Sequence, residues 1–247
     1  MFWRRNQIKR IEIMENGLTY NRDIEYDFEK LNLEHKTVLN LVEEESQVLE
    51  IGCHTGYFSY WLKRKKCEVV GVDIFGPCLD IANQYLIKSI KGNIEDDLTY
   101  YEIEKSKYDV ILFMHVLEHL VNPHELLKRF KNLLKQDGKI IICLPNISNW
   151  NSRVSIIKGN FNYTESGLMD KTHLRFFNYN TSIEMIEDTG YKVVSYHGTS
   201  KVHFQIIPNL TLIWRANNFF SNMMLKFLKS NRNLIDSVLV FEIVPLK

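Results

Sequence analysis

The sequence predicts an α/β protein with a Rossmann-like, doubly wound sheet that is mostly parallel and has an antiparallel final strand. Between residues 48 and 144, short runs rich in Val, Ile and Leu alternate with helical patterns. This alternation is typical of βαβ units around a parallel sheet. The alternation stops after Pro145, which predicts a cap inserted after the fifth strand.

Five runs justify the parallel part of the sheet. The predicted strands cover residues 47–51, 68–73, 86–91, 108–114 and 139–144. The first run is apolar on both faces, as expected for a strand buried between two layers of helices. Leucines at helical spacing predict a helix over 123–134, with Gly138 as its stop signal.

The second half of the chain is less regular. Residues 146–180 are aromatic and Asn-rich, and long irregular insertions of this kind commonly carry function. Thr181 and Glu184 fit a capping box that opens a helix, which Gly190 closes. Two further strands are predicted over 191–196 and 237–244.

The predicted domain organisation has two parts. Residues 1–45 form an N-terminal helical segment, and residues 46–247 form the main domain, with insertions at about 146–180 and 199–230. Within the second insertion, residues 211–230 are amphipathic. We expect a lid or core-packing helix there, with membrane-surface binding or a homodimer contact as alternatives.

Composition excludes several classes of protein. The chain has 247 residues, with 31 basic and 30 acidic side chains. One large α/β domain fits this length, and no nucleic-acid partner is predicted because the basic residues are scattered. No run of eighteen apolar residues is present, so no transmembrane segment is predicted.

The cysteines and the N-terminus predict a cytoplasmic protein. The four cysteines form no C-x-x-C pair, which indicates reduced thiols rather than a disulfide framework. The first five residues are basic and lack the apolar core of a signal peptide.

A ligand-binding loop is predicted at residues 48–56. There a strand runs into a turn with Gly52 and Gly56, and a helix follows from about Tyr57. Glycines let the backbone approach a ligand, and a helix N-terminus offers free N–H donors. Asp73 ends the next strand, where a carboxylate can bind ribose hydroxyls. Its alternative role is to cap the following helix, but loop and acid together predict an adenosine-type ligand.

The loop differs from a nicotinamide dinucleotide site. Such a site prefers G-x-G-x-x-G, whereas here His54 follows the first glycine by two positions and Glu50 precedes the turn. This pattern resembles motif I of class I S-adenosylmethionine-dependent methyltransferases, in which the acidic residue helps hold the methionine end of the cofactor. We therefore expect S-adenosylmethionine as the cofactor and rank a nucleotide-dependent oxidoreductase below it.

The resemblance extends over about residues 35–198. Besides 48–56, it includes the stretches 71–73, 92–95, 108–120, 133–138, 144–146 and 153–177. The family resembled includes ubiquinone-biosynthesis O-methyltransferases, and the last stretch resembles a subgroup often found beside glycosyltransferase genes. The resemblance implies these cofactor-binding residues: Glu50, Gly52, Cys53, His54, Gly56, Asp73, Ile74, Asn93, Ile94, Met114 and His115.

Two residues depart from the family pattern. His54 stands where glycine is common, and its side chain either crowds the carboxylate tail of the cofactor or donates a hydrogen bond to it. Asn93 stands where Asp is frequent, and its carbonyl oxygen still suits the adenine amino group. These departures motivate the rival hypothesis of a non-catalytic cofactor binder or scaffold on a degenerate methyltransferase fold.

A first polar cluster follows the fourth strand. His115, Glu118 and His119 share one face if a helical turn forms there. Three interpretations compete: a metal site, a general base, or a loop fixed by hydrogen bonds. We predict that Glu118 fixes the loop, that His115 faces the transferred methyl group and that His119 is a second catalytic residue. No metal is assigned.

A second cluster lies in the insertion after the fifth strand. His173 is a candidate base for an acceptor hydroxyl, and Arg175 can bind a phosphate or carboxylate. The predicted acceptor-binding residues are Asn146, Tyr163, Asp170 and Arg175. In the alternative interpretation, Asp170 pairs with Arg175 and the adjacent Phe176 and Phe177 belong to the core.

The predicted function is O-methylation of a small molecule or glycan precursor by in-line displacement. N-methylation is the alternative, since an amine needs no base to remove a proton. The glycan acceptor is what the subgroup resemblance implies, because no single residue identifies it.

Overall fold

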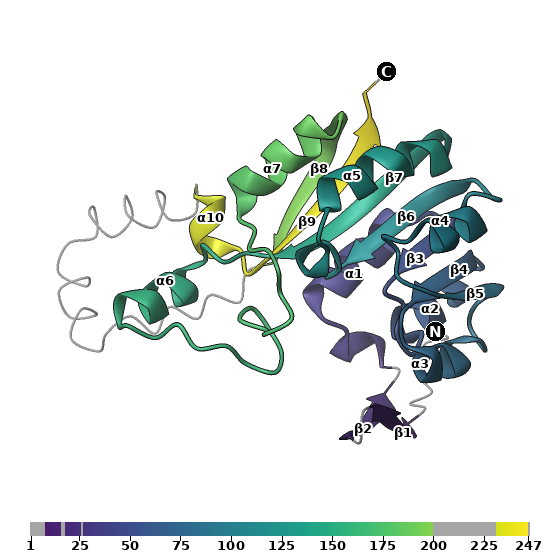
Figure 1. Cartoon of the computed structure of the whole chain (residues 1–247), viewed down its shortest axis with the longest axis horizontal. Helices are drawn as coiled ribbons and strands as arrows, with labels where there is room; N and C mark the ends of the chain where they lie inside the picture. The colour runs from purple at the N-terminus through teal and green to yellow at the C-terminus, as the bar shows by residue number, and fades with distance from the viewer. Residues whose placement is uncertain (1–7, 16–17, 26, 200–230, 247) are drawn as a thin grey trace.

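The computed structural model describes residues 8–15, 18–25, 27–199 and 231–246 of the chain. Seven strands form one sheet in the order β5-β4-β3-β6-β7-β9-β8 (Figure 1). Their bounds are β3 Gln47–Ile51, β4 Glu68–Asp73, β5 Lys88–Lys91, β6 Tyr108–Met114, β7 Leu134–Pro145, β8 Tyr191–Thr199 and β9 Val238–Pro245. β9 pairs antiparallel with β7 and β8, and the other pairs are parallel. The predicted fold class is confirmed.

Helices cover both faces of the sheet. On one face lie α1 (Leu33–Leu41), α2 (Tyr57–Arg64) and α3 (Gly76–Ala82), which pack in one hydrophobic cluster. On the other lie α4 (Asp97–Ile103), α5 (Pro123–Phe130) and α7 (Tyr179–Asp188), in a second cluster. Strand side chains alternate between these two clusters, so the central strands are apolar on both faces, as predicted.

The topology places a ligand site at β3. The chain crosses from β3 to β4 on one side and later to β6 on the other. In open α/β sheets, the carboxyl ends of strands at such a reversal are where ligands bind. The loops after β3, β4 and β6 therefore lie where a ligand is expected to bind.

The N-terminal part differs from the expected helical segment. β1 (Ile8–Glu15) and β2 (Leu18–Glu25) pair antiparallel, with Glu15 opposite Leu18. Asn16-Gly17 between them is a favoured pair for a two-residue hairpin turn, which the prediction overlooked. A short 3₁₀ turn, η1 (Phe28–Lys30), precedes α1.

Gly138 was wrongly predicted to stop a helix. Helix α5 continues only into the 3₁₀ turn η3 (Lys131–Leu133), and β7 begins at the next residue. Gly138 lies inside β7, where a Cβ would stand 2.8 Å from the carbonyl oxygen of Tyr108. Glycine there allows the close approach of β7 to β6.

The capping box of α7 lies three residues earlier than predicted. Asn178 is the N-cap, and its Oδ1 accepts a hydrogen bond from the Thr181 amide (3.0 Å). In return, the Thr181 hydroxyl accepts one from the Asn178 amide (3.0 Å). Asn is as good an N-cap as Thr, so the sequence offered two starts. Gly190, with φ of 74°, follows the end of the helix as predicted.

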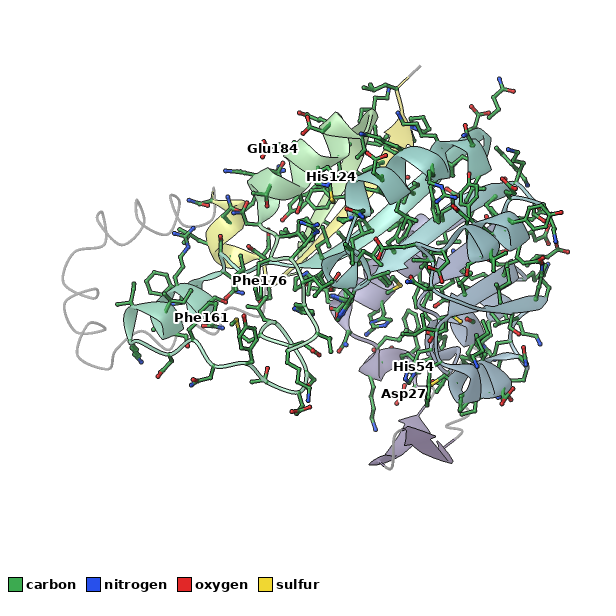
Figure 2. The ribbon with its side chains drawn as sticks, viewed as in Figure 1. Asp27, His54, His124, Phe161, Phe176 and Glu184 are labelled. Carbon is green, nitrogen blue, oxygen red and sulfur yellow. The ribbon has the colours of Figure 1, made fainter. Side chains whose placement is uncertain are left out.

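The insertion after β7 forms the cap, residues 146–178. It contains the helix α6 (Trp150–Ile157) and a returning loop, which together project from one end of the sheet in Figure 1. Figure 2 labels Phe161 in the outer part of this cap and Phe176 where the loop returns toward the sheet. The short helix α10 (Arg232–Ile235) precedes β9.

Three further expectations concern the amphipathic segment, membrane-spanning helices and the cysteines. The amphipathic segment 211–230 lies outside the described residues. Within the described residues, no helix has the length and apolar character needed to cross a membrane. The four cysteines are all free and buried.

Candidate active site

The turn after β3 is built on two glycines with positive φ. Gly52 has φ of 72°, and a Cβ there would stand 2.8 Å from Cγ2 of Val116. Gly56 has φ of 73°, and its Cβ would stand 2.9 Å from Cα of Ala82. Any larger residue would be strained and would push the turn away from its neighbours. The loop is therefore packed tightly against the segment that follows β6 and against the end of α3.

Asp73 connects this loop to the end of β4. Its Oδ2 accepts a hydrogen bond from the backbone amide of His54 (2.8 Å), and its Oδ1 accepts one from the amide of Phe75 (2.9 Å). Each carboxylate oxygen can accept more than one hydrogen bond, so both remain available to ribose hydroxyls. The two predicted parts of the cofactor site thus meet in space.

Glu50 lies buried at the base of the loop. Its Oε2 accepts a hydrogen bond from the Ser59 hydroxyl of α2 (2.5 Å). Burial raises the pKa of Glu50 to about 7; the Ser59 hydrogen bond opposes the rise and the charge of Asp73 adds to it. Near neutral pH this carboxyl therefore exists in both charge states, and a cationic ligand group would favour the ionised one.

The residues predicted to surround the adenine differ in how exposed they are. Ile74 follows Asp73 and is 70% exposed. Ile94 is buried, whereas Asn93 is exposed and its Oδ1 accepts a hydrogen bond from the Glu95 amide (3.0 Å). Met114 is half-buried at the end of β6. An adenine ring packed against Ile74 would cover the exposed side chain of Ile74.

Glu95 makes two hydrogen bonds that the sequence did not predict. Its two carboxylate oxygens accept hydrogen bonds from the amides of Val121 (3.0 Å) and Asn122 (2.6 Å), just before α5. A carboxylate at a helix start is favourable. It holds the segment after β5 against the segment after β6.

His115 is the first residue after β6 and has an unusual backbone. Its φ is 57°, and its amide donates to the carbonyl of Cys143 (3.1 Å). Among the described residues, four non-glycine residues have positive φ, and two of them, His54 and His115, are predicted site residues. Backbone strain of this kind is concentrated at functional sites.

Glu118 does not fix its loop in the way predicted. It lies in the 3₁₀ turn η2 (Leu117–His119) with no exposed surface, and neither carboxylate oxygen has a hydrogen-bond partner among the described residues. Its Oε1 lies 3.5 Å from Nδ1 of His115. Instead, its backbone carbonyl accepts hydrogen bonds from Leu174 (2.9 Å) and Arg175 (3.1 Å) of the cap.

The cap brings His173 to His119. The two rings lie edge to face, with centroids 4.7 Å apart. Nδ1 of His119 lies 3.1 Å from the Thr172 hydroxyl, which donates to Oδ1 of Asp170 (2.6 Å). The pKa of Asp170 is lowered. Burial alone would raise it, but the hydrogen bonds from Thr172 and the two nearby imidazoles have the larger effect. His119 of the first predicted cluster therefore joins Asp170 and His173 of the second in one polar group between sheet and cap.

Other predicted acceptor residues are placed differently. Asn146 is fully buried: its amide donates to the carbonyls of Asn233 (3.2 Å) and Asp236 (2.7 Å) and accepts from the Ser148 amide (2.9 Å). It holds the end of β7 to the segment before β9, which leaves no surface of it for an acceptor. Tyr163 is 60% exposed and packs edge-on against the ring of Phe161.

The alternative pairing of Asp170 with Arg175 does not occur. A guanidinium nitrogen of Arg175 donates to the carbonyl of Val121 instead. Of the aromatic pair, Phe177 is in the core, whereas Phe176 is half-buried with its ring edge-on to His173. The expectation of a core pair holds for one of the two.

His35 of α1 also lies near the site and was not predicted. It packs against the rings of Tyr57 and Phe58 at the start of α2. Burial lowers its pKa, with Glu34 opposing this and the charge of His115 adding to it. The sequence around it shows only a helical pattern, so no signal in the sequence could have identified it.

The fold and the loop geometry define a class I S-adenosylmethionine-dependent methyltransferase domain. The sheet order has its reversal at β3, and the glycine turn there is hydrogen-bonded to the acid that ends β4. The family described as a methyltransferase domain matches residues 23–196, and the chain belongs to this family.

Curated relatives are similar over part of their length. A ubiquinone biosynthesis O-methyltransferase of Glaesserella parasuis is 31% identical over 137 residues, which is 50% of this chain and 58% of that protein. One from Coxiella burnetii is 24% identical over 189 residues, which is 72% of this chain and 78% of that protein. The match thus spans little more than half of the Glaesserella protein.

Solved structures share the fold at low identity. An S-adenosylmethionine-dependent methyltransferase from Archaeoglobus fulgidus has a TM-score of 0.58 and 19% identity, and the match covers 85% of this chain and 91% of that one. Magnesium protoporphyrin IX methyltransferase from Synechocystis, solved with bound S-adenosylhomocysteine, has a TM-score of 0.55 and 14% identity, covering 86% and 82%.

Proposed function

We propose that the chain transfers the methyl group of S-adenosylmethionine to a hydroxyl group of a small-molecule acceptor. The observation that carries the proposal is the hydrogen bond between Asp73 and the His54 amide, which joins the ribose-binding acid to the glycine turn. On either side of it, Glu50 suits the cofactor's ammonium group and Ile74 suits its adenine.

The chemistry asks little of the protein beyond alignment. The acceptor oxygen forms a bond to the methyl carbon while the carbon–sulfur bond breaks, and its electron pair stays on sulfur to give S-adenosylhomocysteine. The chain holds acceptor and methyl in line and excludes water. We assign three histidines to binding the acceptor hydroxyl and accepting its proton. They lie around Glu118 and are His115, His119 and His173.

A hydroxyl is preferred to an amine for two reasons. The three imidazoles offer proton acceptors that only a hydroxyl acceptor needs, and the curated relatives named above are O-methyltransferases. A sugar or glycan precursor is the acceptor that the subgroup resemblance implies. In the cap, the exposed Tyr163 and Arg175, with Asp170, are the side chains we assign to it. Free buried cysteines support a cytoplasmic reaction.

The second candidate function is a cofactor binder without catalysis. His54, with φ of 47°, places a side chain in the turn where the family commonly has glycine. A binder would retain Asp73 and Glu50 but would not turn over an acceptor. The two functions therefore differ in methyl transfer and not in cofactor affinity.

Calorimetric titration with S-adenosylmethionine and S-adenosylhomocysteine tests the cofactor site. We expect micromolar binding that Asp73→Ala abolishes and that Asp80→Ala, an exposed change on α3, retains. Methyl transfer from labelled cofactor to sugar, quinone and amine acceptors then separates catalyst from binder. A folded protein that binds neither compound would contradict both functions.

A further inference from the structure

Glu95 caps the start of α5 from a different part of the chain. Asn122 is the N-cap residue of this helix, yet its own side chain makes no capping hydrogen bond among the described residues. Instead, the two carboxylate oxygens of Glu95 accept hydrogen bonds from the amides of Val121 (3.0 Å) and Asn122 (2.6 Å). Hydrogen bonds to an ionised carboxylate are stronger than those between neutral groups. Glu95 therefore fixes the backbone at the start of α5.

Glu95 is also tied to the predicted adenine segment. Its backbone amide donates a hydrogen bond to Oδ1 of Asn93 (3.0 Å), the oxygen expected to accept one from the adenine amino group. A side-chain carbonyl oxygen has two lone pairs, so the ligand and the Glu95 amide can share it. Ile94 between the two residues is buried, which holds the segment against the sheet. A bound adenine would therefore restrict the residue that fixes the start of α5.

The backbone fixed by Glu95 supports the returning part of the cap. The carbonyl of Val121 accepts a hydrogen bond from the guanidinium group of Arg175. Three positions before Val121, the carbonyl of Glu118 accepts hydrogen bonds from the amides of Leu174 (2.9 Å) and Arg175 (3.1 Å). Leu174 and Arg175 belong to no helix or strand, so these hydrogen bonds to the core set their position.

We propose that Glu95 is a positioning residue that couples cofactor binding to the placement of the acceptor. Hydrogen bonds link Asn93 to Glu95 and Glu95 to Val121. A further one links Val121 to Arg175, which the proposed function assigns to the acceptor, so the inference rests on that function. A ligand that orders a segment removes the cost of ordering it for the next ligand. The acceptor should therefore bind more tightly to the chain that already holds cofactor.

A helix cap without this coupling would behave differently. Loss of such a cap would loosen the start of α5 and the returning part of the cap by the same factor with and without cofactor. Coupling through Glu95 instead predicts that cofactor tightens the returning part only while the carboxylate is present. The deciding quantity is therefore the change that the ligand causes, compared between the parent and the variant.

Hydrogen exchange of the full chain, followed by mass spectrometry, tests the coupling. Saturating S-adenosylhomocysteine should slow exchange in the peptide that contains residues 174 and 175 at least about fivefold, the lower end of coupling between linked sites. Glu95→Ala should lose this slowing, whereas Glu95→Gln, which keeps one acceptor oxygen, should retain part of it. Glu125→Ala, an exposed change in the first turn of α5, is the matched control and should behave like the parent.

Calorimetry with S-adenosylhomocysteine gives the saturating concentration for each variant and separates the two proposals. Slowing in Glu95→Ala equal to that in the parent, or no slowing in a saturated parent, would overturn the coupling and leave the proposed function intact. A folded parent that binds no S-adenosylhomocysteine would contradict the proposed function and the coupling with it. If the alanine variant does not fold, Glu95→Gln decides, and slowing equal to that in the parent would overturn the coupling.

Discussion

Oδ2 of Asp73 accepts a hydrogen bond from the backbone amide of His54, 19 positions earlier in the chain, at 2.8 Å. This bond closes the glycine turn after β3 onto the end of β4. The same carboxylate also accepts the Phe75 amide, so one side chain shapes two loops and keeps lone pairs for a ligand. The conformation of the turn and the affinity for the cofactor should therefore depend on each other.

Asp73→Asn should weaken S-adenosylmethionine binding by about ten- to a hundredfold. The amide removes the charge from hydrogen bonds that are about twice as strong when charged, and its NH₂ group faces donors instead of accepting from them. Calorimetry measures the affinity. Asp80→Asn, on the exposed side of α3, is the control, and equal affinity in both variants would contradict the role of Asp73.

Cofactor affinity should fall as the pH is lowered from 7 to 5.5. The pKa of Glu50 is raised to about 7, so below this pH the carboxyl must lose a proton before it can pair with the ammonium group of the cofactor. The expected loss approaches tenfold per pH unit. Glu50→Gln should bind weakly at pH 7.5 and show little change over this range; a pH dependence equal to that of the unsubstituted chain would contradict the assignment.

The same raised pKa predicts the effect of Glu50→Gln on stability without cofactor. The unfolded chain loses this proton near pH 4.5 and the folded chain only near 7, so the folded state binds more protons between these values. Stability contributed by Glu50 therefore falls as the pH rises through this window. Glu50→Gln should be more stable than the parent by up to about 3 kcal/mol at pH 8, with no difference near pH 4.5.

How much the sequence predicted depends on whether the cause is local. Strands β3, β4 and β6 were predicted because buried parallel strands are continuously apolar, and the turn with Gly52 and Gly56 was predicted because glycines mark close approach. The contact of Asp73 with the His54 amide was not, since it depends on how β4 lies beside β3.

The cap shows what the sequence could not predict. His119 and His173 are 54 positions apart, and only the returning loop brings them together. Glu118 was predicted to fix its loop because a carboxylate usually accepts hydrogen bonds from nearby groups. Its carboxylate oxygens accept none among the described residues, and this depends on side chains from several elements. Asn146 was predicted to bind the acceptor, yet its side chain is occupied by the carbonyls of residues 233 and 236, far along the chain.

His54→Gly should keep cofactor affinity within about threefold. Its backbone amide, which bonds Asp73, is preserved, and glycine adopts φ of 47° without strain. Relief of backbone strain stabilises the folded chain, and the more flexible unfolded chain offsets part of this gain. The net increase in stability should lie between zero and about 1 kcal/mol. Thermal unfolding and calorimetry measure both quantities.

His54→Ala is the control for this prediction, because it removes the imidazole but keeps the Cβ. It should be less stable than His54→Gly by about 1 kcal/mol. A tenfold loss of affinity in both variants would show that the imidazole binds the carboxylate of the cofactor. A clear gain in both would show that the imidazole crowds it.

Asn146→Ala should destabilise the chain by about 2–4 kcal/mol, because it leaves two carbonyls and the Ser148 amide without their buried partner. Urea unfolding measures the change, with the exposed Asn160→Ala as the control.

At a temperature where both variants are folded, cofactor affinity and methyl transfer should match those of the parent. Normal stability combined with a raised KM for the acceptor would contradict the structural role and restore Asn146 as an acceptor contact. The buried position makes that outcome hard to achieve, because an acceptor would have to displace the carbonyl of Asp236, 2.7 Å from the amide nitrogen.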